Sequence, residues 1–226
     1  MAALREKLHN IRTQILSPQT KIFFIGYNKC GTTSLDHLLK SAAIRSVHYH
    51  APMVDFNPLL LRKPLQKIYF SLASEVVRRS SDRAALRKLL DRHTAYSDLF
   101  FFSETSQVEA IEYFELFHDL YPEAFFILND RDENKWLQSR KKHKGGSLVR
   151  EAMKYYATDT DGVIEIWRSK RKAHVENALR FFEGNLRFLH FRIDQDDIKN
   201  LVEFLAPEFK ISDRDWIIMN KTIELN

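Results

Sequence analysis

Hydrophobic residues along the chain occur in two patterns: short continuous runs, and longer stretches in which they recur every three or four positions. The first run covers residues 22–25 and is typical of a strand buried on both faces, whereas Leu35, Leu38 and Leu39 fall on one face of a helix. The same criterion predicts further strands at 44–49, 99–102, 124–128 and 186–193. It predicts further helices at 66–79, 82–93, 106–120, 132–142, 148–157, 162–182 and 196–205.

This alternation of strands and helices predicts an α/β fold in which a parallel sheet lies between two layers of helices. The two most apolar strands, 22–25 and 124–128, are expected to be neighbours at the centre of the sheet. A chain of 226 residues is long enough for one sizeable core, so we expect a single domain over 1–226. The segment 51–92 is too long for an ordinary connection and is expected to form a helical insertion or lid.

Composition and charge narrow the classes of protein. Apolar residues make up 44% of the chain, and no run approaches the ~20 needed to span a bilayer, so neither a disordered nor a membrane-spanning chain is indicated. The net charge is +5, with basic runs at 140–144 and 168–172. Nucleic-acid binding is one interpretation of such runs, but we favour solvated helix faces because acidic residues nearly balance the total. The single cysteine, Cys30, excludes an internal disulfide and suits a reducing cytosol.

The polar segment 26–34, between the first strand and the first helix, has the arrangement of an anion-binding loop. Backbone N–H groups of such a loop converge on one point, and the dipole of the following helix favours negative charge there, so we expect a phosphate group as the ligand. Gly26 and Gly31 reproduce the glycine spacing of the G-x-x-x-x-G-K-[ST] loop of P-loop NTPases. However, Thr32 stands where that pattern has lysine, and the only lysine of the loop is Lys29. The alternative is an ordinary turn whose hydroxyl residues cap the helix.

The segment from Lys29 to Thr33, Lys-Cys-Gly-Thr-Thr, resembles the K-x-G-T-T loop of sulfotransferases that use 3′-phosphoadenosine 5′-phosphosulfate (PAPS). This resemblance implies a P-loop-like three-layer α/β/α sulfotransferase fold. It also implies that the lysine lies at the oxygen bridging phosphate and sulfate, while the threonines bind the 5′-phosphate. The implied donor-binding residues of this loop are Lys29, Cys30, Gly31, Thr32, Thr33 and Ser34. A reactive thiolate is the alternative role of a cysteine at a helix N-terminus, but for Cys30 we expect only the backbone N–H to matter.

A second group of residues follows the 124–128 strand. Arg131 and, eight residues later, Ser139 resemble the sulfotransferase site for the 3′-phosphate of the donor. The arginine fork can hold two phosphate oxygens at once. Eight residues of unbroken helix would span ~12 Å, so Arg131 is expected on the loop, reaching back towards the serine. The alternative is that Asp130 and Glu133 form a helix capping box and that Arg131 makes a surface pair.

The resemblance covers most of the chain and includes three further segments that look like those of bacterial sulfotransferases, at 96–99, 121–128 and 219–222. Three features depart from the cytosolic aryl sulfotransferases. Asn28 replaces the proline before the loop lysine, the T-H-L-P histidine base is missing, and so is the terminal Arg-Lys-Gly segment, for which Asn220 and Lys221 are the open candidates. The chain therefore resembles carbohydrate or bacterial sulfotransferases more than phenol or steroid ones.

The resemblance implies an enzyme that moves a sulfuryl group from PAPS to a hydroxyl group of a glycan, a lipid or a small metabolite, and the single cysteine favours a cytoplasmic location. A metal is not required in principle, because the transferred group bears less charge than a phosphoryl group. As the general base that the acceptor hydroxyl needs, we place Asp98 ahead of His48. His48 and His50 have the spacing of metal ligands, but the sequence suggests no third ligand near them. A P-loop small-molecule kinase and a non-catalytic nucleotide- or RNA-binding protein are the alternative functions.

Overall fold

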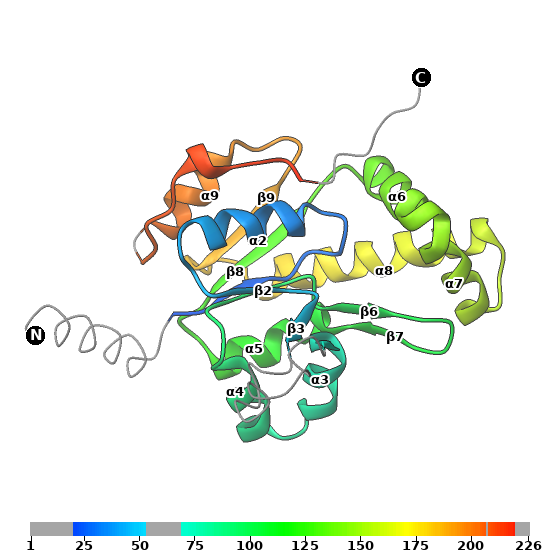
Figure 1. Ribbon diagram of the computed structural model, residues 1–226, viewed down its shortest axis with the longest axis horizontal. Coiled ribbons are helices and arrows are strands. Elements are labelled where there is room, and N and C mark those ends of the chain that lie inside the picture. Colours follow the sequence, from blue (N-terminus) through cyan, green and yellow to red (C-terminus); the bar gives the residue numbers. More distant parts are fainter. Residues whose placement is uncertain (1–19, 53–68, 207, 220–226) are drawn as a thin grey trace, which may run out of the picture.

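The computed structural model describes residues 20–52, 69–206 and 208–219, and it has the predicted α/β architecture. Five parallel strands form the central sheet in the order β2-β5-β1-β8-β9 (Figure 1). Their bounds, in that order, are Ser46–His48, Ala95–Ser97, Ile22–Phe24, Phe125–Asp130 and Phe188–Arg192. The prediction that the two most apolar strands are central neighbours is confirmed, because β1 and β8 pair with Phe23 beside Phe126.

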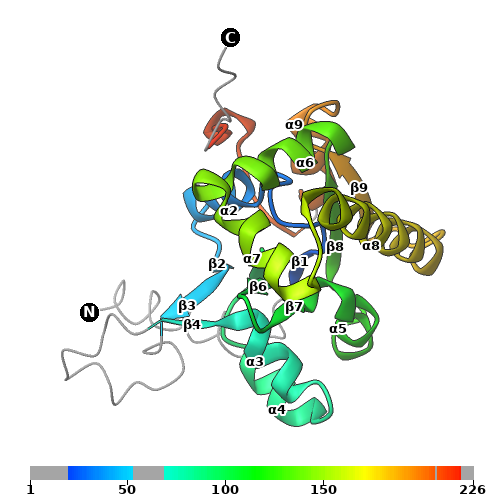
Figure 2. The same ribbon diagram turned by 90° about the vertical axis from the view of Figure 1, so that its right-hand side faces the viewer.

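Helices cover both faces of the central sheet (Figure 1, Figure 2). On one face lie α2 (Thr32–Ser41) and α9 (Ile198–Leu205), and on the other lie α5 (Phe114–Leu120) and α8 (Thr160–Phe181). The other helical elements are α3 (Leu72–Arg79), α4 (Arg83–Leu90), η4 (Ala110–Tyr113), α6 (Glu133–Lys142), η5 (His143–Gly146), α7 (Ser147–Tyr156) and η6 (Asp213–Asp215). Within the described part of the chain, none of the helices is long and apolar enough to cross a membrane.

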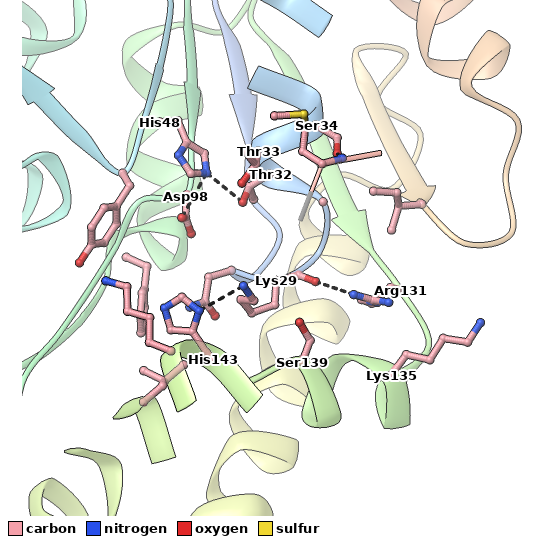
Figure 3. A pocket seen from close by; sticks show the side chains of 18 of the residues that line it. Lys29, Thr32, Thr33, Ser34, His48, Asp98, Arg131, Lys135, Ser139 and His143 are labelled. Atoms are coloured by element: carbon pink, nitrogen blue, oxygen red, sulfur yellow. Dashed lines mark hydrogen bonds and ion pairs between the residues drawn. The ribbon is translucent and has the colours of Figure 1, made fainter. Parts of the chain in front are cut away.

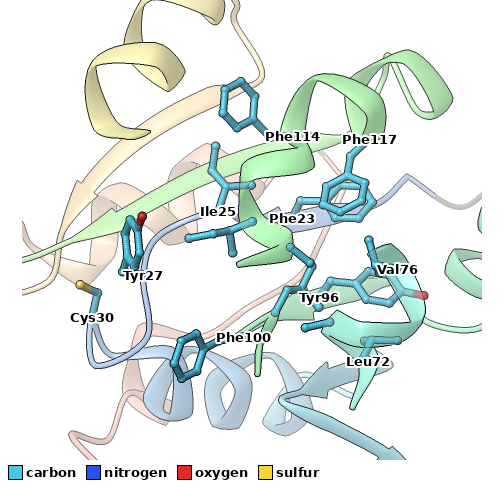
Figure 4. Close-up of a cluster of buried hydrophobic side chains, with 14 of the residues drawn as sticks. Phe23, Ile25, Tyr27, Cys30, Leu72, Val76, Tyr96, Phe100, Phe114 and Phe117 are labelled. Carbon is cyan, nitrogen blue, oxygen red and sulfur yellow. The ribbon is translucent and has the colours of Figure 1, made fainter. Parts of the chain in front are cut away.

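The continuous apolar runs of β1 and β8 are explained by two separate cores. Successive side chains of a strand point to opposite faces, so a strand covered on both sides must be apolar at every position. Phe23 belongs to the larger core, where its ring stacks 4.9 Å from that of Phe117 on α5 (Figure 4). Ile22 and Phe24 belong to the smaller core, which α2 and α9 complete with Leu35, Leu38, Leu39, Leu201 and Leu205.

The strand predicted at 99–102 is present as β6 (Phe100–Phe102), but it does not belong to the central parallel sheet. The third strand along the chain in that sheet, β5, ends at Ser97, and Asp98 then adopts a left-handed conformation with φ 54°. The Asp98 carbonyl accepts a hydrogen bond from the Phe100 N–H, which turns the chain out of the sheet. β6 (Phe100–Phe102) then pairs antiparallel with β7 (Gln107–Glu109), and this hairpin delays the helix predicted at 106–120 until η4 and α5.

Only part of the segment 51–92 is described, because residues 53–68 lie outside the described ranges. The helix predicted at 66–79 begins only at Leu72, since the residues before it form β4 (Tyr69–Ser71), which pairs with β3 (His50–Pro52). The helices α3 and α4 follow, as predicted for a helical segment. Its role as an insertion or lid stays a prediction.

Candidate active site

The loop that joins β1 to α2, residues 26–31, contains two residues with left-handed backbone conformations near its end. Lys29 has φ 69° and Gly31 has φ 75°, and Gly31 is the N-cap of α2. No side chain within the described part of the chain caps this helix, so the alternative in which a hydroxyl residue serves as the cap is wrong. Thr32, Thr33 and Ser34 instead form the first turn of α2, where the helix dipole favours an anion.

One buried side chain of β8 connects the two ends of the 26–31 loop. The amide oxygen Oδ1 of Asn129 accepts a hydrogen bond from the Gly26 N–H at 2.9 Å, and its Nδ2 donates to the Cys30 carbonyl at 3.0 Å. Asn129 is 1% exposed. A Cβ atom on Gly26 would lie 1.7 Å from the Asn129 carbonyl oxygen, so the close approach of loop and strand requires a glycine here.

The segment after β8 holds two more carbonyl groups of the same loop. Trp136 on α6 donates from Nε1 to the Asn28 carbonyl at 3.0 Å. Arg131, on the connection between β8 and α6, donates from Nη1 to the Lys29 carbonyl at 3.1 Å. The loop and the β8–α6 connection therefore form one hydrogen-bonded unit at the carboxyl edge of the sheet, which is where ligands bind in α/β proteins of this kind.

Arg131 lies on the loop, as expected from the sequence, and its side chain lines a cavity together with Ser139 of α6 (Figure 3). Among the described residues, the Nε atom of Arg131 is buried and has no hydrogen-bond partner. The capping box expected as the alternative is wrong, because Asp132 is the N-cap of α6 and accepts from the Lys135 N–H. Asp130 instead forms an ion pair with Arg171 of α8 at 2.5 Å.

His48 and Asp98 meet because β2 and β5 are adjacent parallel strands. His48 is the last residue of β2 and Asp98 directly follows β5. The His48 Nε2 atom lies 3.3 Å from Asp98 Oδ2 and 3.1 Å from Thr32 Oγ1. Burial raises the pKa of Asp98, and the second carboxylate oxygen, Oδ1, is buried without a partner among the described residues. Asp98 thus lies directly after the carboxyl end of β5, beside the carboxyl end of β2.

The side chain of Lys29 enters the same space from the 26–31 loop. Its Nζ atom lies 3.3 Å from Nδ1 of His143, the first residue of η5 (Figure 3). Burial lowers the pKa of Lys29, while the nearby Asp98 carboxylate acts in the opposite direction. The ammonium group therefore shares the cavity with Asp98 on one side and Arg131 on the other.

A single cavity of about 660 Å³ brings together nine of the ten residues singled out in the sequence: Lys29, Gly31, Thr32, Thr33, Ser34, His48, Asp98, Arg131 and Ser139. Sequence reasoning missed several other lining residues, including Tyr49, Lys135, His143 and Glu151. His143 lies in the basic run 140–144, which was expected to be a solvated face. That expectation fails for Arg140, which is fully buried. The spacing of apolar residues along the chain could not indicate this burial, because Arg140 is itself a charged residue.

Comparison with known proteins identifies the family. Residues 21–188 match the family model described as a sulfotransferase domain. The chain belongs to this sulfotransferase family. Sulfotransferase STF9 from Mycobacterium avium is structurally similar, with a TM-score of 0.55 over 93% of this chain and 70% of that one; at 14% sequence identity this shows the shared fold alone. The search of curated proteins found no match.

The sulfotransferase has no candidate metal cluster within its described residues, where no three His, Cys, Asp or Glu side chains are grouped to hold an ion. His48, which has the spacing of a metal ligand with His50, instead contacts the side chains of Asp98 and Thr32 through its Nε2 atom. Asn220 and Lys221 lie outside the described residues. The chain just before them reaches the cavity, because the Met219 N–H donates to Ser34 Oγ at 2.8 Å.

Cys30 is the one predicted site residue that does not line the cavity. Its N–H donates to the Tyr27 carbonyl within the loop, and its side chain is completely buried. Burial raises the pKa of the thiol to about 12, so the reactive thiolate is excluded at neutral pH. The small side chain fills space behind the loop.

We therefore predict that Cys30 resists alkylation in the folded sulfotransferase. At pH 8 a thiol with a pKa of about 12 is almost entirely protonated, and its burial blocks access. Mass spectrometry after iodoacetamide treatment should find little label on the native protein and one equivalent in guanidinium, because the chain has one cysteine. Rapid labelling of the native protein would contradict this.

We also predict that Asn129→Ala destabilises the protein by about 2–4 kcal/mol, because it leaves a buried N–H and a buried C=O without their partner. The measurement is the free energy of unfolding in urea. Asn200→Ala, at an exposed position of α9, is the matched control and should stay within ~0.5 kcal/mol of wild type. Equal effects of the two substitutions would show that the loop does not depend on Asn129.

Proposed function

We propose that this sulfotransferase moves the sulfuryl group of PAPS to the hydroxyl group of an acceptor. The observation that carries the proposal is the cavity in which Lys29 and Arg131 lie side by side, because Arg131 donates to the Lys29 carbonyl at 3.1 Å. Lys29 is suited to the reacting end of the donor, and Arg131 is suited to its 3′-phosphate. When bound, PAPS supplies the activated sulfuryl group.

The residues present fit such a donor. The first turn of α2 offers backbone N–H groups and the hydroxyls of Thr32 and Thr33 for the 5′-phosphate. Arg131 offers its fork and Ser139 a hydroxyl for the 3′-phosphate. The buried Nε of Arg131, which lacks a partner among the described residues, is the kind of donor that an anionic ligand would satisfy.

Lys29 is proposed to stabilise charge on the leaving phosphate. Negative charge develops on the oxygen that bridged phosphate and sulfur, and an ammonium group already in place stabilises it without reorganisation. The site contains no second lysine directly after Gly31, where a P-loop kinase would have one. No observation in the structure favours the kinase or the RNA-binding alternative, and both serve as outcomes of the test below.

Asp98 is proposed as the general base, with His48 as its partner. Asp98 lines the cavity, and His48 Nε2 lies 3.3 Å from its Oδ2, so the imidazole holds in place the carboxylate that is proposed to take the acceptor proton. The raised pKa of this carboxyl makes it a stronger base than an ordinary aspartate. A hydroxyl-bearing glycan, lipid or small metabolite is the proposed acceptor, and the proposed location is the cytoplasm, which suits the free thiol of Cys30.

The direct test is thermal unfolding with adenosine 3′,5′-bisphosphate, compared with ATP and magnesium. A ligand at a hundredfold over its Kd adds ~2.7 kcal/mol of stability, so the bisphosphate should raise the Tm clearly and ATP with magnesium should not. Preferential stabilisation by ATP with magnesium would favour a kinase. Stabilisation by RNA alone would favour the non-catalytic protein.

Arg131→Ala should weaken binding of adenosine 3′,5′-bisphosphate by about 2–3 kcal/mol, because a charge-assisted contact to the 3′-phosphate is lost. Calorimetry with adenosine 5′-phosphate measures how much of the loss comes only from the missing bond to the Lys29 carbonyl. Arg168→Ala, which removes a surface arginine of α8, is the control and should leave both affinities unchanged. Equal losses for both nucleotides in Arg131→Ala would show that Arg131 does not recognise the 3′-phosphate.

Asp98→Asn should lower kcat/KM by about 10²–10⁴, the usual contribution of a general base, and His48→Gln should lower it less. The base acts when deprotonated, and burial raises its pKa, so wild-type activity should fall at a pH above the ordinary carboxylate value of ~3.9 as the pH decreases. This acid limb should be missing in Asp98→Asn. Our order of the two residues is wrong if Asp98→Asn keeps wild-type activity while His48→Gln abolishes it.

A further inference from the structure

Among the described residues, His143 is the imidazole that contacts the side chain of Lys29. It stands at the start of η5, in the turn between α6 and α7, and its Nδ1 atom is 3.3 Å from Lys29 Nζ (Figure 3). An ammonium group has three donors and no acceptor, so the hydrogen bond requires an unprotonated Nδ1 and places the imidazole proton on Nε2. The contact therefore specifies both the charge and the tautomer of His143.

The surroundings of His143 keep it in that neutral form. Burial lowers its pKa to about 4, and the positive charges of Lys29, Lys144 and Arg140 act in the same direction. Near neutral pH the ring therefore acts as a hydrogen-bond acceptor and adds no charge to the site. A carboxylate in the same place would also accept from Lys29, but it would cancel the positive charge that an anionic donor needs.

The backbone fixes the position of His143 on both sides. Directly after it, Lys144, Gly145 and Gly146 have φ angles of 46°, 64° and 84°, a left-handed run that turns the chain sharply into α7. Three residues before it, the side chain of Arg140 is completely buried. The Arg140 guanidinium lies 4.3–5.8 Å from the ring centroids of Trp167, Trp136, Phe100 and Tyr27.

We propose that His143 is a positioning residue of this sulfotransferase: its neutral imidazole accepts a hydrogen bond from Lys29 and holds the ammonium group in the cavity. This inference rests on the proposed function of Lys29. A lysine side chain is long and flexible, so without an acceptor the ammonium would sample several positions. Held by His143, it is already in place when charge develops on the leaving oxygen.

The contact also favours the charged form of Lys29. Three positive groups near the ammonium disfavour its charged form: Arg131 from the β8–α6 connection, Arg140 from α6 and Lys144 from η5. The negative carboxylate of Asp98, after β5, favours the charged form. A neutral acceptor stabilises the ammonium relative to the amine without repelling an anionic ligand. Loss of this acceptor should therefore lower the pKa of Lys29 further.

The first experiment needs no substrate. Long-range ¹H–¹⁵N NMR of the labelled protein distinguishes the two imidazole tautomers, and the His143 signal is the one lost in His143→Asn. We expect the tautomer with hydrogen on Nε2, and we expect this signal to shift more in Lys29→Met than those of the other histidines. A hydrogen on Nδ1, or a His143 signal that Lys29→Met leaves unchanged, would overturn the proposal.

The second experiment measures the pH dependence of kcat/KM. His143→Leu should lower kcat by roughly tenfold to a hundredfold, as expected for loss of one charge-assisted hydrogen bond. It should also move the alkaline limb of the pH profile, where activity falls as Lys29 loses its proton, to lower pH. His143→Asn should restore most of the activity and the original limb, because its Oδ1 can take the place of Nδ1. Equal activity of the Leu and Asn variants would overturn the proposal.

Two controls separate this inference from other causes. Lys142→Leu adds an apolar side chain at the adjacent exposed position and should keep the wild-type limb. Binding of adenosine 3′,5′-bisphosphate should stay within a few-fold of wild type in His143→Leu, which shows that the variant is folded and the donor site intact. If that nucleotide fails to bind the wild-type protein, the proposed function fails, whereas the NMR result still decides whether His143 holds Lys29.

Discussion

Two hydrogen bonds of one buried amide hold the candidate site together. Asn129 accepts from the Gly26 N–H and donates to the Cys30 carbonyl, so it joins both ends of the 26–31 loop to β8. The bonds form because β1 and β8 are parallel neighbours whose carboxyl ends lie at the same edge of the sheet. Arg131, two residues further along, adds its bond to the Lys29 carbonyl. The 26–31 loop and the arginine are thus parts of one hydrogen-bonded unit.

The charges of the cavity are arranged according to what each part of the proposed reaction needs. Lys29 and Arg131 place positive charge where an anionic donor would lie, and His143 contacts the lysine without cancelling that charge. Asp98 directly follows β5, and its Oδ2 lies 3.3 Å from His48 Nε2. Burial raises the pKa of Asp98, which strengthens it as the proposed base. Burial also lowers the pKa of Lys29, so neighbouring groups such as the Asp98 carboxylate are needed to favour the charged ammonium.

Much of the fold, and of the set of residues that line the proposed donor side of the cavity, could be predicted because the signals are local. The continuous apolar runs of β1 and β8 indicated central strands, and the loop after β1 carried its lysine, glycine and hydroxyl residues within a few positions. The strand expected at 99–102 forms, but it lies outside the central sheet for a non-local reason. Residues 100–102 are as apolar as a sheet strand, but they pair with β7 after the turn at Asp98. No periodicity could distinguish the two partners.

The sequence by itself determined the α/β class, the position of the polar loop after the first strand and the residues that this loop offers to a ligand, because hydrophobic spacing and loop composition act over short distances along the chain. Only the tertiary structure decided that His48 meets Asp98, that Lys29 meets His143 and that Cys30 faces away from the cavity. These contacts join residues from different elements, 50 or more positions apart in the first two cases. Strand order and the left-handed turns bring them together, and these depend on packing over the whole sheet.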